Sequence, residues 1–165
     1  MRTSVKNNLT PGQKRLEAAA WILVGLTFLL AVCGGCTIKD AFPTHYGAGG
    51  QADGFGSAWT LLLYPVLGAV ALGILSLVAH CAAPETWNLP FVLRETNKTR
   101  VFRDMLTMLF LLEVEIAAVF LAAVALSLMQ KGELLLPLTG VFLAGMAWTL
   151  IHGCRKAAGD NRAEA

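Results

Sequence analysis

The run MLTMLFLLEVEIAAVFLAAVALSLM, residues 105–129, decides the class of this protein. It exceeds the roughly 20 apolar residues that a helix needs to cross a hydrocarbon core. Only its two glutamates carry charge. The run therefore predicts a transmembrane helix.

Three further apolar runs accompany it, at Ala18–Val32, Trp59–Ala79 and Leu134–Ile151. The first reaches membrane-spanning length only when Cys33–Cys36 is included, and the last is short. Hydrophobic residues make up 56% of the chain and charged residues 15%, whereas soluble domains carry roughly 25% charged residues. We expect an all-α bundle of four transmembrane helices in a single membrane domain, residues 1–165, with spans at about 17–36, 58–80, 105–129 and 134–152.

Positive charge is concentrated in the segments on one side of this predicted bundle. Eleven of the 13 Lys and Arg residues lie before the first span, between the second and third spans, or after the fourth; only Lys39 and Lys131 lie elsewhere. Basic residues are concentrated in cytoplasmic loops. The pattern predicts a multi-pass protein of the cytoplasmic (inner) membrane with both termini in the cytoplasm, an outer loop at 37–57 and an inner loop at 81–104. The net charge of +2 is too small to indicate nucleic-acid binding.

The outer loop contains the stretch FPTHYGAGGQADGFGSAW, residues 42–59. Its five glycines indicate tight turns in place of regular structure. His45 and Asp53 lie on either side of several of these glycines, which would let the two side chains fold together. A His–carboxylate pair can orient the imidazole, bind a metal or respond to pH; alternatively, both side chains only hold the loop in shape. One His and one carboxylate are too few to specify a zinc site.

This stretch resembles the bacterial membrane family named domain of unknown function 1648, whose hallmark is Pro-x-His-aromatic, a Gly, then Asp and Gly before the second helix. The matching positions are Pro43, His45, Tyr46, Gly50, Asp53, Gly56 and Ser57, and Asn88, Pro90 and Asn97 are similar to the family's inner-loop segment. The resemblance covers most of the first 125 residues. It implies an inner-membrane protein, some of whose relatives act as immunity or signalling proteins against a secreted peptide toxin. It makes five loop residues the candidates for ligand or partner binding: Pro43, His45, Tyr46, Gly50 and Asp53.

Glu113 and Glu115 place two carboxylates within the third predicted span, where each costs about 2–3 kcal/mol or more. Successive helix residues are about 100° apart, so the two side chains point to nearly opposite faces. Glu115 shares its face with Ala118, Ala122 and Ala125, a small-residue stripe that predicts a position facing the bundle interior. Glu113 is expected toward lipid or at a subunit contact. Each is either a proton-linked or ligand-gating carboxylate, or a protonated hydrogen-bonding group between helices.

Cys33 and Cys36 form a C-G-G-C motif at the outer end of the first span. This spacing permits a disulfide in an oxidising compartment, and it also occurs in redox and zinc motifs. The plain alternative is a tightly packed helix end made of small residues. Four metal-ligating side chains fall at the predicted inner helix ends: His80, Cys81, His152 and Cys154. If those ends touch, this set would suit Zn²⁺.

Small residues four apart also predict close helix contacts, at Ala69/Gly73 and Gly140/Ala144. The predicted function is a non-enzymatic sensing or interaction module, immunity- or signalling-like, that uses the outer loop. The alternative is a metal- or proton-linked intramembrane enzyme or transporter component that uses Glu113 or Glu115, with an oligomer forming its pathway. The predicted partners are the lipid bilayer and a peptide or membrane protein, and no sequence feature specifies a cofactor.

Overall fold

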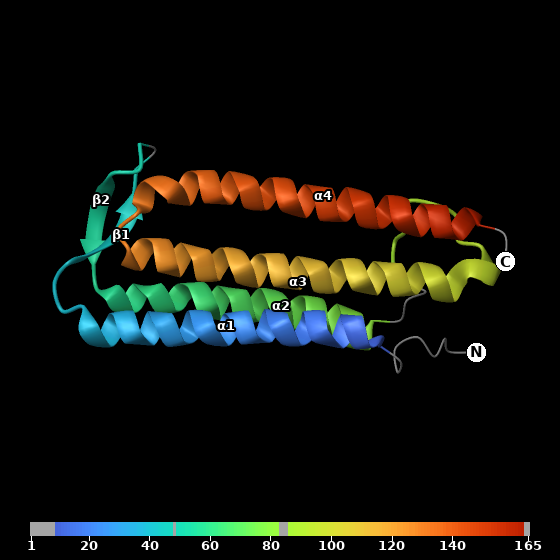
Figure 1. Ribbon diagram of the computed structural model, residues 1–165, viewed down its shortest axis with the longest axis horizontal. Helices are drawn as coiled ribbons and strands as arrows, with labels where there is room; N and C mark the ends of the chain where they lie inside the picture. The colour runs from blue at the N-terminus through green and yellow to red at the C-terminus, as the bar shows by residue number, and fades with distance from the viewer. Residues whose placement is uncertain (1–8, 48, 83–85, 164–165) are drawn as a thin grey trace.

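The computed structural model describes residues 9–47, 49–82 and 86–163 (Figure 1). Within these residues, four helices are long and apolar enough to cross a membrane. They are α1 (Pro11–Thr37), α2 (Leu63–Cys81), α3 (Lys98–Leu128) and α4 (Leu135–Arg162). The four apolar runs thus form four such helices, as predicted. Arg2 and Lys6, two of the basic residues counted above, lie outside the described residues.

The helices extend beyond the apolar runs at their polar ends. α1 begins at Pro11 rather than at 17, because Thr10 and Gln13 form a capping box: Gln13 N donates to Thr10 Oγ1 (3.2 Å), and Thr10 N donates to Gln13 Oε1 (2.9 Å). Proline is well accommodated in the first helical turn. Likewise, α3 begins at Lys98 rather than 105, and α4 ends at Arg162 rather than 152. Hydropathy marks the membrane core and not the helix end.

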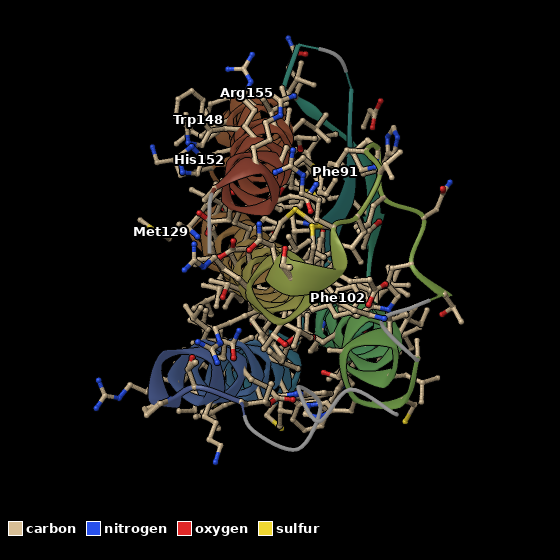
Figure 2. The ribbon with its side chains drawn as sticks, turned by 90° about the vertical axis from the view of Figure 1, so that its right-hand side faces the viewer. Phe91, Phe102, Met129, Trp148, His152 and Arg155 are labelled. Atoms are coloured by element: carbon tan, nitrogen blue, oxygen red, sulfur yellow. The ribbon has the colours of Figure 1, made fainter. Side chains whose placement is uncertain are left out.

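α3 is the central helix and packs against α1, α2 and α4. Viewed along the bundle, α1 and α2 lie side by side on one side of α3, and α4 lies on the other (Figure 2). The α3 face toward α1 and α2 is closely packed, with Phe110 and Ala117 fully buried. Most large side chains of α4 are exposed; Val141 and Trp148 are both 72% exposed. Such an apolar surface suits contact with lipid chains.

The bundle has two distinct ends (Figure 1). α1 begins and α4 ends at one of them, here called the terminal end. The opposite end, here called the hairpin end, carries two short strands, β1 (Phe42–Tyr46) and β2 (Ala52–Gly56), and the turn η5 (Gly132–Leu134) that joins α3 to α4.

The glycine-rich segment forms an antiparallel β-hairpin, so the expectation that this loop lacks regular structure is wrong, although the protein is mostly helical as predicted. Phe42 anchors β1, because its ring is 1% exposed and packs with Ala31, Ala58 and Leu61. Gly50 supplies the backbone conformation of the turn, with a φ of +78° that other residues rarely adopt. The glycines therefore shape a regular hairpin.

Close contacts occur at glycines other than Gly73 and Gly140, although Ala69 does pack against the buried cluster that α1, α2 and α3 form. A Cβ at Gly73 or Gly140 would meet nothing within 4 Å, so neither glycine lies in a tight contact. The buried glycines of the C-G-G-C motif do: a Cβ at Gly34 would lie 2.7 Å from Leu128, and one at Gly35 would lie 2.6 Å from Trp59. Small residues four apart permit a close contact, but the arrangement of the other helices decides where it forms.

A strap (residues 86–97) joins α2 to α3 at the terminal end and packs against the helices. Trp87 packs edge-on to Phe102 of α3, with ring centroids 6.0 Å apart, and Phe91 lies beside buried residues of α3 and α4 (Figure 2). Asn97 Nδ2 donates to the carbonyls of Asn161 (2.9 Å) and Ala163 (2.8 Å). In return, Asn161 Nδ2 donates to the Val92 carbonyl (2.9 Å), and its Oδ1 accepts from Arg94 N (2.8 Å). These bonds fasten the end of α4 to the strap.

Candidate functional site

The hairpin brings His45 and Asp53 together. His45 pairs with Gly54 in the strand register, and the register shifts on both sides of His45. Nδ1 of His45 is hydrogen-bonded to Oδ1 of Asp53. A Cβ at Gly54 would lie 2.9 Å from the Cβ of His45, so this close approach depends on glycine. The side chains remain 72% and 54% exposed, respectively, which leaves the pair open to the surroundings.

The hairpin rests on the turn between α3 and α4. The Tyr46 ring lies against Gly132 so closely that a Cβ there would overlap it, and a Cβ at Gly50 would lie 2.5 Å from Glu133 Cα. The Tyr46 hydroxyl is buried and has no hydrogen-bond partner among the described residues. Burial raises the pKa of the Tyr46 phenol, and the neighbouring Tyr64 and Glu133 raise it further. These contacts hold the hairpin against the helices.

A cavity of about 470 Å³ lies between the hairpin and the start of α4. Its polar side chains are those of Thr44, His45, Tyr46, Tyr64, Glu133 and Thr139, and Gly47, Gly49 and Gly50 line it with backbone. The candidate Pro43 does not line this cavity; it lies beside a smaller one of about 100 Å³. Of the five candidates, His45, Tyr46 and Gly50 thus share one cavity, and Asp53 joins them through His45.

The two intramembrane glutamates face different helices, and the position predicted for Glu113 is wrong. Glu113, expected toward lipid or a subunit contact, is fully buried, and Ser76 Oγ of α2 donates to its Oε1 (3.0 Å). Glu115 faces α4 and accepts a hydrogen bond from Thr149 Oγ1. The α3 face that carries Glu115 lies toward α4 alone, whereas the Glu113 face is covered by both α1 and α2. Within the part of the chain that the structure describes, each glutamate has a buried Oε2 without a hydrogen-bond partner.

The other predicted ligands do not assemble into a site. Cys33 and Cys36 form no disulfide, and both are exposed. The described residues contain no group of three or more His, Cys, Asp or Glu side chains that could hold a metal ion. His80 Nε2 bonds to Glu17 Oε1 of α1 (2.7 Å), and His152 stacks on Trp148 on the outward side of α4 (Figure 2). The proposed zinc set of His80, Cys81, His152 and Cys154 is therefore wrong, because α3 separates its two halves.

Several polar partners were missed at the sequence level. Ser76 and Thr149 bind the two glutamates, and Glu17 binds His80. Gln13, 2% exposed, ties α1 to α3 by donating to the Arg103 carbonyl (2.9 Å) and to Thr107 (3.0 Å). The sequence does offer a signal for Ser76 and Thr149, because a hydroxyl inside an apolar span can hydrogen-bond to a carboxylate on a neighbouring helix.

Comparison with known proteins supports the identification suggested by the hairpin residues. An uncharacterized protein of Archaeoglobus fulgidus is 30% identical over 98 residues, which cover 56% of this chain and 54% of that protein. The chain thus spans about half the length of this relative. No solved structure matches this chain. Residues 22–69, which include most of α1, the hairpin and the start of α2, match the family described as Domain of unknown function (DUF1648).

Proposed function

We propose that this chain is a multi-pass protein of the cytoplasmic membrane that holds its terminal end in the cytoplasm and presents its hairpin outside. The distribution of Lys and Arg supports this orientation, because only Lys39 and Lys131 fall in segments at the hairpin end. The DUF1648 match and the four apolar helices are compatible with it.

We further infer a non-enzymatic interaction role, in which the hairpin recognises a peptide or the exposed segment of another membrane protein, as in an immunity or signalling module. The observation that carries this proposal is the exposed His45–Asp53 pair on a hairpin held in place by Tyr46 and Gly132. Asp53 engages Nδ1 and thereby orients the imidazole, which directs Nε2 to a partner. A preorganised polar group loses less entropy on binding than a mobile one.

A photocrosslinking experiment tests this role. A photoreactive phenylalanine at Phe55, a hairpin residue that is 62% exposed, would capture whatever binds the hairpin in living cells. We expect a discrete crosslinked product that His45→Ala and Asp53→Asn abolish. His152→Ala, which alters an exposed histidine on α4, is the matched control and leaves the product intact. An unchanged product in both hairpin variants would exclude recognition through this pair.

A second candidate function is proton-linked transport, and the two buried carboxylates favour it. Glu113 and Glu115 each accept a hydrogen bond at one oxygen from a hydroxyl of a neighbouring helix, and the other oxygen has no partner in residues 9–47, 49–82 and 86–163. Near the terminal end, Glu17 of α1 is hydrogen-bonded to His80 of α2. A carboxylate at this depth is rare unless it is paired or functional.

Proton flux into vesicles distinguishes this candidate from a structural role. Proteoliposomes that contain a trapped pH-sensitive dye would report flux under an imposed pH gradient. If Glu113 carries protons, Glu113→Gln reduces the flux to that of empty vesicles, while Glu95→Gln, an exposed site in the strap region, does not. Flux equal to that of empty vesicles for the unmodified protein would leave Glu113 as a structural hydrogen-bonding group.

A further inference from the structure

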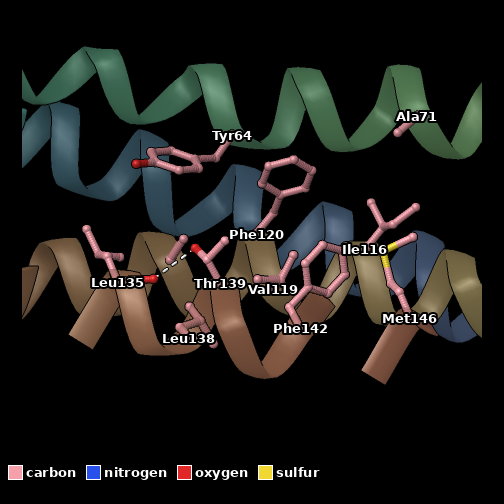
Figure 3. A pocket seen from close by; sticks show the side chains of 11 residues that line it. Tyr64, Ala71, Ile116, Val119, Phe120, Leu135, Leu138, Thr139, Phe142 and Met146 are labelled. Atoms are coloured by element: carbon pink, nitrogen blue, oxygen red, sulfur yellow. Dashed lines mark hydrogen bonds between the residues drawn. The ribbon is translucent and has the colours of Figure 1, made fainter. Parts of the chain in front are cut away.

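A second cavity, of about 480 Å³, lies between α2 and α4 with α3 as its floor (Figure 3). Its walls are almost entirely apolar. Ala71 comes from α2, Phe120 and Ile116 from α3, and Phe142 and Met146 from α4. The cavity exists because α4 packs chiefly on α3 and not on α2. Its volume falls in the range of roughly 300–1,000 Å³ that is usual for small-molecule sites.

The apolar cavity between α2 and α4, here called the groove, adjoins the polar cavity under the hairpin. Tyr64, Leu135 and Thr139 line both cavities. The Tyr64 ring lies across the groove wall, and its hydroxyl points toward the Leu135 end, which is the hairpin end (Figure 3). Beyond these shared residues lie His45 and Glu133. The combined site therefore has a long apolar part and, at the hairpin end, a polar part that includes Glu133. Such a combination suits an amphiphile.

The size of the groove favours a hydrocarbon chain over another helix. The groove runs beside α4 from Leu135 to Met146, which corresponds to about 17 Å along a helix axis. A helix of that length and roughly 10 Å width would fill about 1,300 Å³, more than the about 970 Å³ of empty space in the groove, part of which is open to the surroundings. The bilayer around α2 and α4 supplies hydrocarbon chains directly.

The charges at the polar part of the site match a headgroup that carries both signs. Glu133 lines the polar cavity, and the Nζ atom of Lys131 lies 3.9 Å from its Oε1. Both side chains are about half exposed. An ammonium group would pair with the Glu133 carboxylate, and a phosphate would pair with Lys131 and accept hydrogen bonds from hydroxyl groups such as that of Thr44. A headgroup that contains a phosphate but no ammonium group would bring no positive charge close to the Glu133 carboxylate.

We propose that the groove binds one membrane phospholipid of the hairpin-side leaflet, with an acyl chain between α2 and α4 and a phosphoethanolamine headgroup beneath the hairpin. The apolar part of this site is independent of recognition through the His45–Asp53 pair, since its walls lie on the helices. The headgroup part shares the polar cavity with His45.

Native mass spectrometry of the full chain tests the proposal. The protein would be reconstituted in vesicles of equal parts phosphatidylethanolamine and phosphatidylglycerol, and then released in a mild detergent. We expect one phosphatidylethanolamine retained per protomer. Ala71→Trp fills the groove and should lower this retention at least about tenfold, whereas Val70→Trp, on the exposed face of the same helix, leaves it unchanged. Met146→Trp and its control Leu143→Trp repeat the comparison on α4.

A separate variant tests which headgroup the site prefers. Glu133→Gln should abolish the preference for phosphatidylethanolamine over phosphatidylglycerol, while Glu95→Gln at the terminal end should preserve it. Three results would overturn the proposal: no retained lipid, equal retention in the groove variants and their controls, or a second copy of the chain bound in place of the lipid. An unmodified protein without lipid preference would overturn the headgroup assignment.

Discussion

Gly132 and Tyr46 form the contact on which the position of the hairpin depends. The tyrosine ring occupies the space that a side chain at 132 would need, and a Cβ at the neighbouring Gly50 would lie 2.5 Å from Glu133 Cα. Glycine thus serves two purposes at this end of the molecule: it permits the positive φ of the hairpin turn, and it lets two backbone segments and a ring meet. The exposed His45–Asp53 pair is held in place by this contact.

Gly132→Ala should destabilise the protein by about 1–3 kcal/mol, the usual cost of forcing an added group into a packed contact. The added methyl overlaps the Tyr46 ring, so the hairpin must move. Gly140→Ala is the matched control: it adds the same methyl to α4 where nothing lies within 4 Å, and helix propensity makes it neutral or stabilising by up to about 1 kcal/mol. Chemical unfolding in detergent measures both changes. Equal stability of the two variants would contradict this packing.

The raised pKa of Tyr46 predicts a loss of stability at alkaline pH. Because the folded-state pKa lies above the unfolded value, its contribution is fully present below the unfolded pKa, near 10, and is lost as the pH rises through the folded value. Tyr46→Phe removes the ionisable group and should flatten this decline. Thermal unfolding at a series of alkaline pH values compares the two proteins. The same decline in Tyr46→Phe would show that another group is responsible.

At the scale of the elements, the strap and the end of α4 form one unit. Asn97 binds two carbonyls near the end of α4, and Asn161 binds the strap backbone at two points. Both asparagines are nearly buried, at 6% and 5% exposure. A buried polar group that loses its hydrogen-bond partner destabilises a protein by about 1–3 kcal/mol. Replacing either asparagine therefore leaves polar groups of the opposite segment, the strap or the end of α4, without a partner.

Asn97→Ala should therefore increase hydrogen exchange in the last turns of α4, although residue 97 lies in a different element. Asn161→Ala should increase exchange in the strap around Val92 and Arg94. The double variant should cost less than the sum of the single variants, because the two residues share one network. Hydrogen exchange with mass spectrometry reads each segment separately. Exchange confined to the site of each substitution would show that the strap and α4 are not coupled.

The four helices were predictable from the sequence because an apolar run of spanning length has few alternatives in a membrane. The directions of Glu113 and Glu115 were not, because helical periodicity places them on opposite faces without saying which face α1 and α2 cover. The hairpin was missed because strand pairing depends on contacts such as that of Phe42 with Ala58 and Leu61. The pairing of His45 with Asp53 was anticipated from the glycines around them.

For the whole molecule, the central position of α3 explains both candidate regions. One face of α3 joins α1 and α2 and buries Glu113, whereas the other supports α4 and leaves a groove beside α2. The hairpin lies at one end of the bundle, and the strap lies at the other together with most of the basic residues that the structure describes. A four-helix protein of this form therefore differs chemically between its two ends.

Cysteine accessibility tests the central claim, that the hairpin lies outside the cytoplasm and the strap inside it. In a background with Ser at positions 33, 36, 81 and 154, single cysteines would replace Gln51 at the hairpin turn or Glu95 in the strap region, both exposed. We predict that a membrane-impermeant maleimide added to spheroplasts labels Gln51→Cys at once and Glu95→Cys only after lysis. Labelling of Glu95→Cys before lysis, with Gln51→Cys protected, would contradict the orientation and the recognition role that depends on it.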